Sequence, residues 1–128
     1  MITISKNKGP FFDKVGILVS TVCLLHCMIV PLLYLIFPFA LFPFLSSEWV
    51  HLTLASLAVP IAIAAMKMGY SKHGSKRPLY IVLLGMLMLW GALLAHDSPW
   101  LETIVAVIGA ASIAMAHHLN HTLMGKPR

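Results

Sequence analysis

Charged side chains are scarce in this sequence. Lys, Arg, Asp and Glu make up 10% of the 128 residues, and only four residues are acidic, whereas soluble domains average about 25% charged residues. Apolar residues supply 59% of the chain, and the mean hydropathy is +0.89. A soluble chain of this length cannot hide so much apolar surface in its core. The composition therefore predicts an integral membrane protein of one domain.

The sequence also lacks the motifs of several protein classes. It has no P-loop, which argues against transport driven by a nucleotide. It has no basic patch interleaved with aromatic side chains, so nucleic acid is not expected as a partner. Cysteine occurs only at Cys23 and Cys27, a spacing that does not suggest the framework of a secreted disulfide-rich domain. We expect both thiols to be reduced.

The apolar residues that dominate the chain form four long runs. Each run is compatible with a helix that crosses a hydrocarbon core of about 30 Å, so the predicted fold is all-α, a bundle of four transmembrane helices. The predicted spans are residues 13–37, 48–68, 79–95 and 100–119. The predicted organisation is a basic N-terminal lead over residues 1–12, a membrane domain over residues 13–121, and a short cytoplasmic tail over residues 122–128.

The basic residues predict the orientation of these spans. They cluster before the first span, between the second and third, and after the fourth (Lys6, Lys8 and Lys14; Lys67, Lys72, Lys76 and Arg77; Lys126 and Arg128). Positive charge accumulates on the cytoplasmic side of membrane proteins. We therefore expect both termini and the 68–78 loop inside, and the 38–47 and 96–99 turns outside.

The first span contains the candidate functional site, the segment Cys23-Leu24-Leu25-His26-Cys27. Ionisable groups are costly in hydrocarbon, so their presence there indicates function. On a helix, Cys23 and Cys27 lie on one face, and His26 lies at its edge. Two thiols and an imidazole form a ligand set for a soft metal. The alternative is that the cysteines are small buried packing residues.

Further histidines lie near the ends of the other spans. His51 is near the predicted outer end of the second span, together with Glu48, His96 and Asp97. His117 and His121 are four residues apart near the inner end of the fourth span. These positions predict donors at outer, middle and inner levels, as a cation path would need, although histidines also suit a helix C-terminus without any ligand. We interpret His73 and His96 as solvated turn residues.

Several segments resemble the MerC-domain family, small bacterial inner-membrane proteins linked to mercury resistance. The resemblance rests on Asp13-Lys14-Val15-Gly16, Ser20, the Cys23–Cys27 segment and Pro31. It continues through His51, Gly69-Tyr70 and Ala116-His117-His118-Leu119-Asn120, and it covers roughly residues 12–121. It implies a multi-pass protein of the bacterial inner membrane that takes up Hg(II) by thiolate exchange, with Cys23 and Cys27 as relay ligands, and that is not an enzyme.

The resemblance has two departures that leave the cargo open. The first cysteines of the family's mercury transporters lie closer together than Cys23 and Cys27 do in this chain. The family's mercury transporters carry a second cysteine pair near the cytoplasmic end, where this chain offers His117, His118 and His121. A Cys2His centre also suits Zn(II) or Cu(I), so the bound metal ion is expected to be Hg, Zn or Cu. The alternatives are a redox or haem-binding membrane protein and a metal-sensing accessory subunit. Because 128 residues make a thin pathway, a homo-oligomer in the lipid bilayer is also expected.

Overall fold

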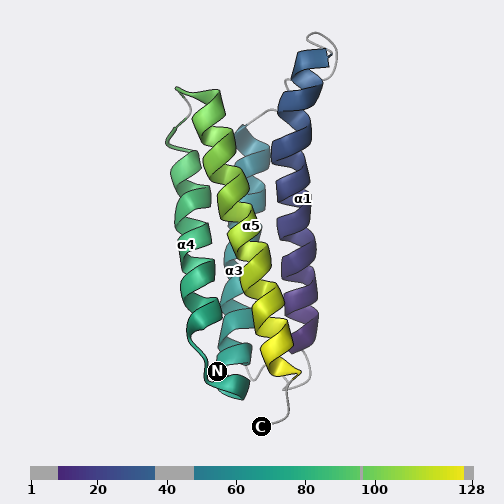
Figure 1. Ribbon diagram of the computed structural model, residues 1–128, viewed down its shortest axis with the longest axis vertical. Helices are drawn as coiled ribbons and strands as arrows, with labels where there is room; N and C mark the ends of the chain where they lie inside the picture. The colour runs from purple at the N-terminus through teal and green to yellow at the C-terminus, as the bar shows by residue number, and fades with distance from the viewer. Residues whose placement is uncertain (1–8, 37–47, 96, 126–128) are drawn as a thin grey trace.

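The computed structural model describes residues 9–36, 48–95 and 97–125, and these residues form four helices (Figure 1). The helices are α1 (Gly9–Ile36), α3 (Glu48–His73), α4 (Arg77–Ala92) and α5 (Pro99–Met124). The described ranges contain no strand. The predicted all-α bundle is confirmed.

Helices α3 and α5 each contact all of the other three helices, and the most extensive contacts of the bundle are those of α5 with α4 and with α1. Figure 1 shows α1 and α4 on opposite sides of α5, with α3 behind it. The helices alternate in direction, so the start of α1, the turn between α3 and α4, and the end of α5 lie at one end. That turn includes Gly74, whose φ of 68° favours glycine, and the Gly74 N–H donates to the Tyr70 carbonyl at 2.9 Å.

Helices α3 and α5 run further than the sequence predicted. Helix α3 continues to His73 and has Lys72 and His73 in its last turn, while α5 continues to Met124 with His121 in its last turn. Basic side chains stabilise the negative end of a helix dipole, so polar residues there extend the helix instead of ending it. The predicted span boundaries were placed where the apolar runs end, which is too early.

Helix α4 is shorter than the other three. It has 16 residues, about 24 Å of rise, and ends at Ala92 because tighter turns follow: Leu94 N–H donates to Gly91 O, and Ala95 N–H to Ala92 O. Among the described residues, three helices are long and apolar enough to span a membrane: Pro10–Val30, Trp49–His73 and Pro99–Met124. Together with the apolar α4, they form a helical membrane bundle.

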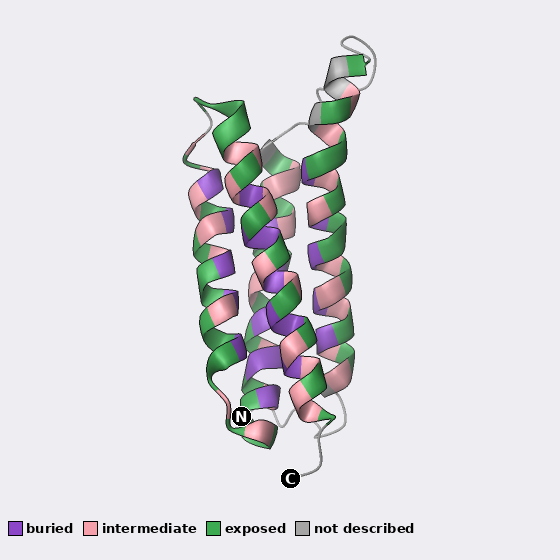
Figure 2. Cartoon of the chain, in the orientation of Figure 1, coloured by how far each residue is buried: buried purple, intermediate pink, exposed green. Residues whose placement is uncertain are grey.

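The surface of the bundle is apolar and its interior is built from small side chains. Large residues such as Leu18, Leu87 and Leu94 are exposed on the outside, where lipid would contact them (Figure 2). The buried positions include many alanines (Ala55, Ala58, Ala62, Ala65, Ala92, Ala106, Ala110 and Ala116). Small residues let helix backbones approach closely in the absence of a hydrophobic driving force between helices.

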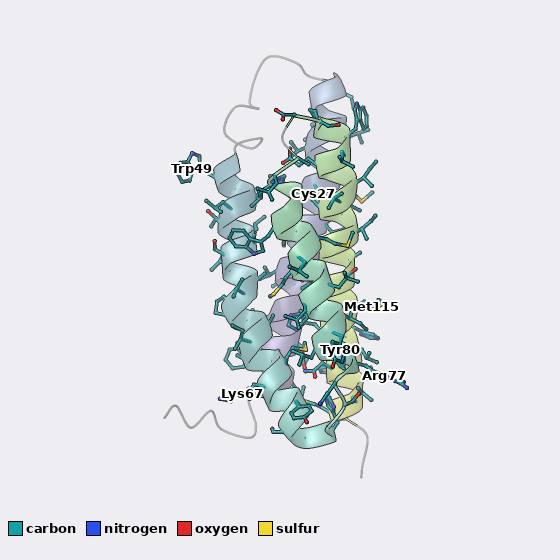
Figure 3. All side chains as sticks on the ribbon, turned by 90° about the vertical axis from the view of Figure 1, so that its left-hand side faces the viewer. Cys27, Trp49, Lys67, Arg77, Tyr80 and Met115 are labelled. Atoms are coloured by element: carbon teal, nitrogen blue, oxygen red, sulfur yellow. The ribbon has the colours of Figure 1, made fainter. Side chains whose placement is uncertain are left out.

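The two ends of the bundle differ in charge. Figure 3 shows Lys67 and Arg77 toward one end and Trp49 toward the other. The remaining basic residues of the described ranges, Lys14, Lys72 and Lys76, belong to the end of Lys67 and Arg77, where α1 begins and α3 turns into α4. Under the positive-inside rule this would be the cytoplasmic end; the orientation stays a prediction.

Helices α4 and α5 approach each other closely at two glycines. A Cβ added at Gly85 would lie 2.8 Å from the Gly109 carbonyl oxygen, and one added at Gly109 would lie 2.9 Å from the Gly85 carbonyl oxygen. Real Cβ atoms essentially never approach a neighbour so closely. The two glycines therefore determine how near α4 lies to α5.

This contact predicts opposite effects for two alanine substitutions in α4. Gly85→Ala should destabilise the protein by about 1–3 kcal/mol, because its methyl group forces the two backbones apart. Gly91→Ala is the matched control: nothing lies within 4 Å of its added Cβ, so it should be neutral or stabilising. Thermal unfolding in detergent micelles measures both. A Gly85→Ala variant as stable as the wild type would contradict the packing described here.

Candidate metal centre

The candidate ligands on α1 belong to its buried face. The buried residues of α1, wherever burial is described, are Asp13, Gly16, Ser20, Cys23 and Cys27. Their alternating spacing of three and four keeps them on one side of a helix. Cys23 and Cys27 are 4% and 3% exposed. The prediction that the two cysteines share one face is confirmed, and that face points into the bundle.

Four of the predicted ligands come together on this face. The Cys27 Sγ atom lies 3.8 Å from His51 Nε2 of α3, and Cys23 is buried one turn before Cys27 on the same face of α1. The rings of His26 and His51 meet edge to face, with centroids 5.3 Å apart and an interplanar angle of 78°. Both thiols are free. We call Cys23, His26, Cys27 and His51 the thiol cluster.

The partner on the other side of His51 was not predicted from the sequence. Glu102 Oε1 of α5 lies 3.5 Å from His51 Nδ1, and the two side chains are 21% and 27% exposed. The signal was an acidic residue within an apolar helix, in the first turn of α5. The cluster lies toward the end of the bundle where Trp49 projects, since Figure 3 places Cys27 in that half.

The thiol cluster is not a finished coordination sphere. Within residues 9–36, 48–95 and 97–125, no three or more His, Cys, Asp and Glu side chains are already arranged to hold a metal ion. A cavity of about 10 Å³ lies between the helices beside Cys23. This volume is close to what one water molecule needs. Its lining comes from all four helices (Val19, Ser20, Cys23, Leu54, Ala58, Leu89, Ala110 and Ile113).

The other predicted ligands lie elsewhere. His117 is buried opposite Asp13, whose Oδ1 atom is 3.1 Å from His117 Nδ1. Asp13 precedes Cys27 by about 20 Å along the axis of α1, so His117 does not reach the thiol cluster. His121 is half-buried one turn further along α5. Of the predicted outer group, His96 and the side chain of Glu48 lie outside the described part of the chain.

A buried polar network surrounds His117 at the end of the bundle where α1 begins. The side-chain amide of Asn120 donates to both carboxylate oxygens of Asp13, at 3.0 and 2.9 Å, and to the Ala65 carbonyl at 3.1 Å. Asp13, His117 and Asn120 are at most 1% exposed. Because buried polar groups are costly unless paired, this network joins α1, α3 and α5 firmly.

The network extends to His73, which the sequence analysis interpreted wrongly as a solvated turn residue. His73 is half-buried at the end of α3, and its Nε2 lies 2.9 Å from Asn120 Oδ1. The Ser75 N–H donates to His73 Nδ1 at 3.0 Å. A neutral ring that accepts at Nδ1 carries its proton on Nε2, so His73 donates to Asn120. The error arose because α3 extends past the predicted end of its span.

Two glycines make room for this network. A Cβ at Gly16 would overlap the ring of His117, and a Cβ at Gly69 would overlap the side chain of Asn120. No other residue can therefore occupy these positions without moving His117 or Asn120. Asp13, Gly16, Gly69, His117 and Asn120 all belong to the segments on which the sequence resemblance rests.

The segments that form this arrangement match a known protein family. The family model described as MerC mercury resistance protein matches residues 13–122 of the chain. The chain belongs to this family. No curated protein and no solved structure matches it significantly. The resemblance seen in the sequence is confirmed.

Membership in the MerC family gives the function in outline. MerC proteins are membrane proteins of mercury resistance and transport, and this chain has the long apolar helices of a multi-pass membrane protein. The residues of the thiol cluster and of the polar network all lie within the matched residues 13–122.

The network around Asn120 predicts a stability defect for this MerC protein. Asn120→Leu removes the amide that donates to Asp13 and Ala65. Asp13 Oδ1 keeps His117 as a partner, but Asp13 Oδ2 loses the Asn120 donor inside the bundle. The expected loss is about 1–3 kcal/mol, measured by thermal unfolding in micelles. Thr122→Val is the control, because that exposed hydroxyl donates only to the Leu119 carbonyl of its own helix. Equal stability of the two variants would contradict the role given to the network.

Proposed function

We propose that this MerC-family protein carries Hg(II) through the membrane by thiol exchange at Cys23 and Cys27, with His51 as a third donor. The observation that carries the proposal is the 3.8 Å approach of Cys27 Sγ to His51 Nε2, which joins a buried thiol pair to a half-exposed imidazole. Thiolates are the protein ligands that soft cations prefer. His26, which packs against the His51 ring, is the fourth member of the proposed site.

The proposed exchange conserves protons and electrons. Hg(II) arrives bound to two thiolates of a carrier. The Cys27 sulfur forms a new bond to mercury, one carrier sulfur leaves, and the proton of the Cys27 thiol passes to that leaving group. Cys23 then displaces the second carrier thiolate in the same way. Each step exchanges one Hg–S bond for another, so it needs neither nucleotide nor redox partner.

Exposure supports an order for the two steps. The side chain of His51 is 27% exposed, whereas both cysteines are nearly fully buried. Mercury that reaches the His51 side meets Cys27 first, because Cys27 contacts His51. Cys23 follows one turn along α1, beside the cavity lined by Ser20. Movement beyond Cys23 requires that cavity to widen, since its present volume is about 10 Å³.

We propose His117 and His121 as donors for a later step at the other end of the bundle. They lie one turn apart on α5, and the Asp13 carboxylate beside His117 Nδ1 leaves His117 Nε2 as the free donor position. Imidazole suits Zn(II) or Cu(I) as well as it suits mercury. These two residues therefore keep the borderline metals open as additional cargo.

Uptake by reconstituted vesicles tests the proposal. Vesicles that contain the protein and an internal thiol should accumulate radioactive Hg(II) offered as a thiol complex. The double substitution Cys23→Ser/Cys27→Ser should reduce the rate to that of protein-free vesicles, because serine replaces each soft sulfur ligand with a hard oxygen. Uptake at the wild-type rate by the double variant would contradict the proposal.

A variant with relocated thiols provides the matched control. Leu25 and Ile29 have the same spacing as Cys23 and Cys27, but they are 49% and 45% exposed on the outer face of α1. Adding Leu25→Cys and Ile29→Cys to the double serine variant restores the number of thiols without restoring the site. This variant should bind mercury and fail to transport it. Transport by the relocated thiols would show that thiol content alone suffices.

A further inference from the structure

Glu102 is an acidic residue whose position the transport proposal does not yet explain. It lies in the first turn of the apolar helix α5, where the positive end of the helix dipole favours a carboxylate. Its side chain is only 21% exposed, and its Oε1 lies 3.5 Å from His51 Nδ1. A carboxylate within a membrane helix is costly, so its retention beside a candidate ligand calls for a function.

The hydrogen-bonding capacity of the three groups determines the state of His51. An ionised carboxylate can only accept, so the nitrogen that faces Glu102 carries the hydrogen. A neutral imidazole has one such hydrogen, so the other nitrogen, Nε2, keeps its lone pair. That nitrogen faces Cys27 Sγ at 3.8 Å. A carboxylate 3.5 Å from Nδ1 therefore favours the form of His51 whose lone pair is directed at the thiol pair.

We infer that Glu102 is the positioning residue of the metal site: it holds His51 as the Nδ1–H tautomer, with Nε2 directed at Cys27 and ready to bind the cation. The inference rests on the proposed function for its cation. Histidines that bind metals usually donate their other ring N–H to a carboxylate or carbonyl, which fixes the ring and makes the ligand more basic. His26 packs edge to face on the same ring and limits its rotation.

Nuclear magnetic resonance of the metal-free protein tests the tautomer directly. Protein with ¹⁵N-labelled histidine, in micelles at about pH 8 where imidazole is mostly neutral, should show the Nδ1–H pattern for His51. The His51→Gln variant assigns the signals. Glu102→Leu should shift the pattern toward Nε2–H. The control is Thr103→Val, because that hydroxyl donates to the Pro99 carbonyl of its own helix, and it should leave the pattern unchanged.

Mercury affinity, measured by competition with a small dithiol, provides the second readout. Glu102→Leu should weaken binding by about 10- to 100-fold. His51→Gln should weaken it at least as much, and the double variant should lose nothing further, because Glu102 acts only through His51. The Thr103→Val control should bind like the wild type.

Two results would overturn the inference. One is an unchanged His51 tautomer in Glu102→Leu; the other is a loss of affinity in the double variant that equals the product of the two single losses. The failure of the transport proposal is distinguishable from these results. Mercury binding that survives Cys23→Ser/Cys27→Ser would refute the thiol site, while the tautomer measured without metal would still decide whether Glu102 orients His51.

Discussion

The structure depends on one constraint: hydrocarbon leaves α1 a single face on which polar groups can be placed. Asp13, Gly16, Ser20, Cys23 and Cys27 occupy that face. The exposed side chains between them are apolar, except for Lys14 at the basic end and Thr21, whose hydroxyl donates to the Ile17 carbonyl of its own helix. A carboxylate, a hydroxyl and two thiols are thereby aligned along the interior of the bundle. The spacing of these residues along α1 determines where the polar groups lie in the bundle, and the other helices supply the side chains that contact them.

Those partners differ at the two ends of the bundle. Near Asp13, the carboxylate pairs with His117 Nδ1 and with the Asn120 amide, and two glycines allow the His117 ring and the Asn120 amide to approach the backbone. Such a hydrogen-bonded cluster rigidifies the packing around it. Near Cys27, the contacts are longer, at 3.5 and 3.8 Å, and His51 and Glu102 are partly exposed. The same face of α1 thus has a rigid end and an end suited to exchange.

The sequence predicted the helical bundle and the shared face of Cys23 and Cys27, because both follow from local periodicity. It could not predict the contacts of Asp13, since its partners His117 and Asn120 lie 104 and 107 residues away in the chain. The contact between Glu102 and His51 was missed for the same reason. His73 was misjudged because helix ends were placed at the limits of apolar runs, whereas α3 continues through its basic last turn.

X-ray absorption at the mercury edge tests the central claim most directly. For protein loaded with one Hg(II) per chain and freed of other thiols, the account predicts two sulfur neighbours and one nitrogen neighbour. Substitution of His51 by glutamine should remove the nitrogen contribution and leave both sulfurs, because Cys23 and Cys27 lie together on α1 without help from α3. A mercury atom with only oxygen and nitrogen neighbours in the wild-type protein would contradict the account.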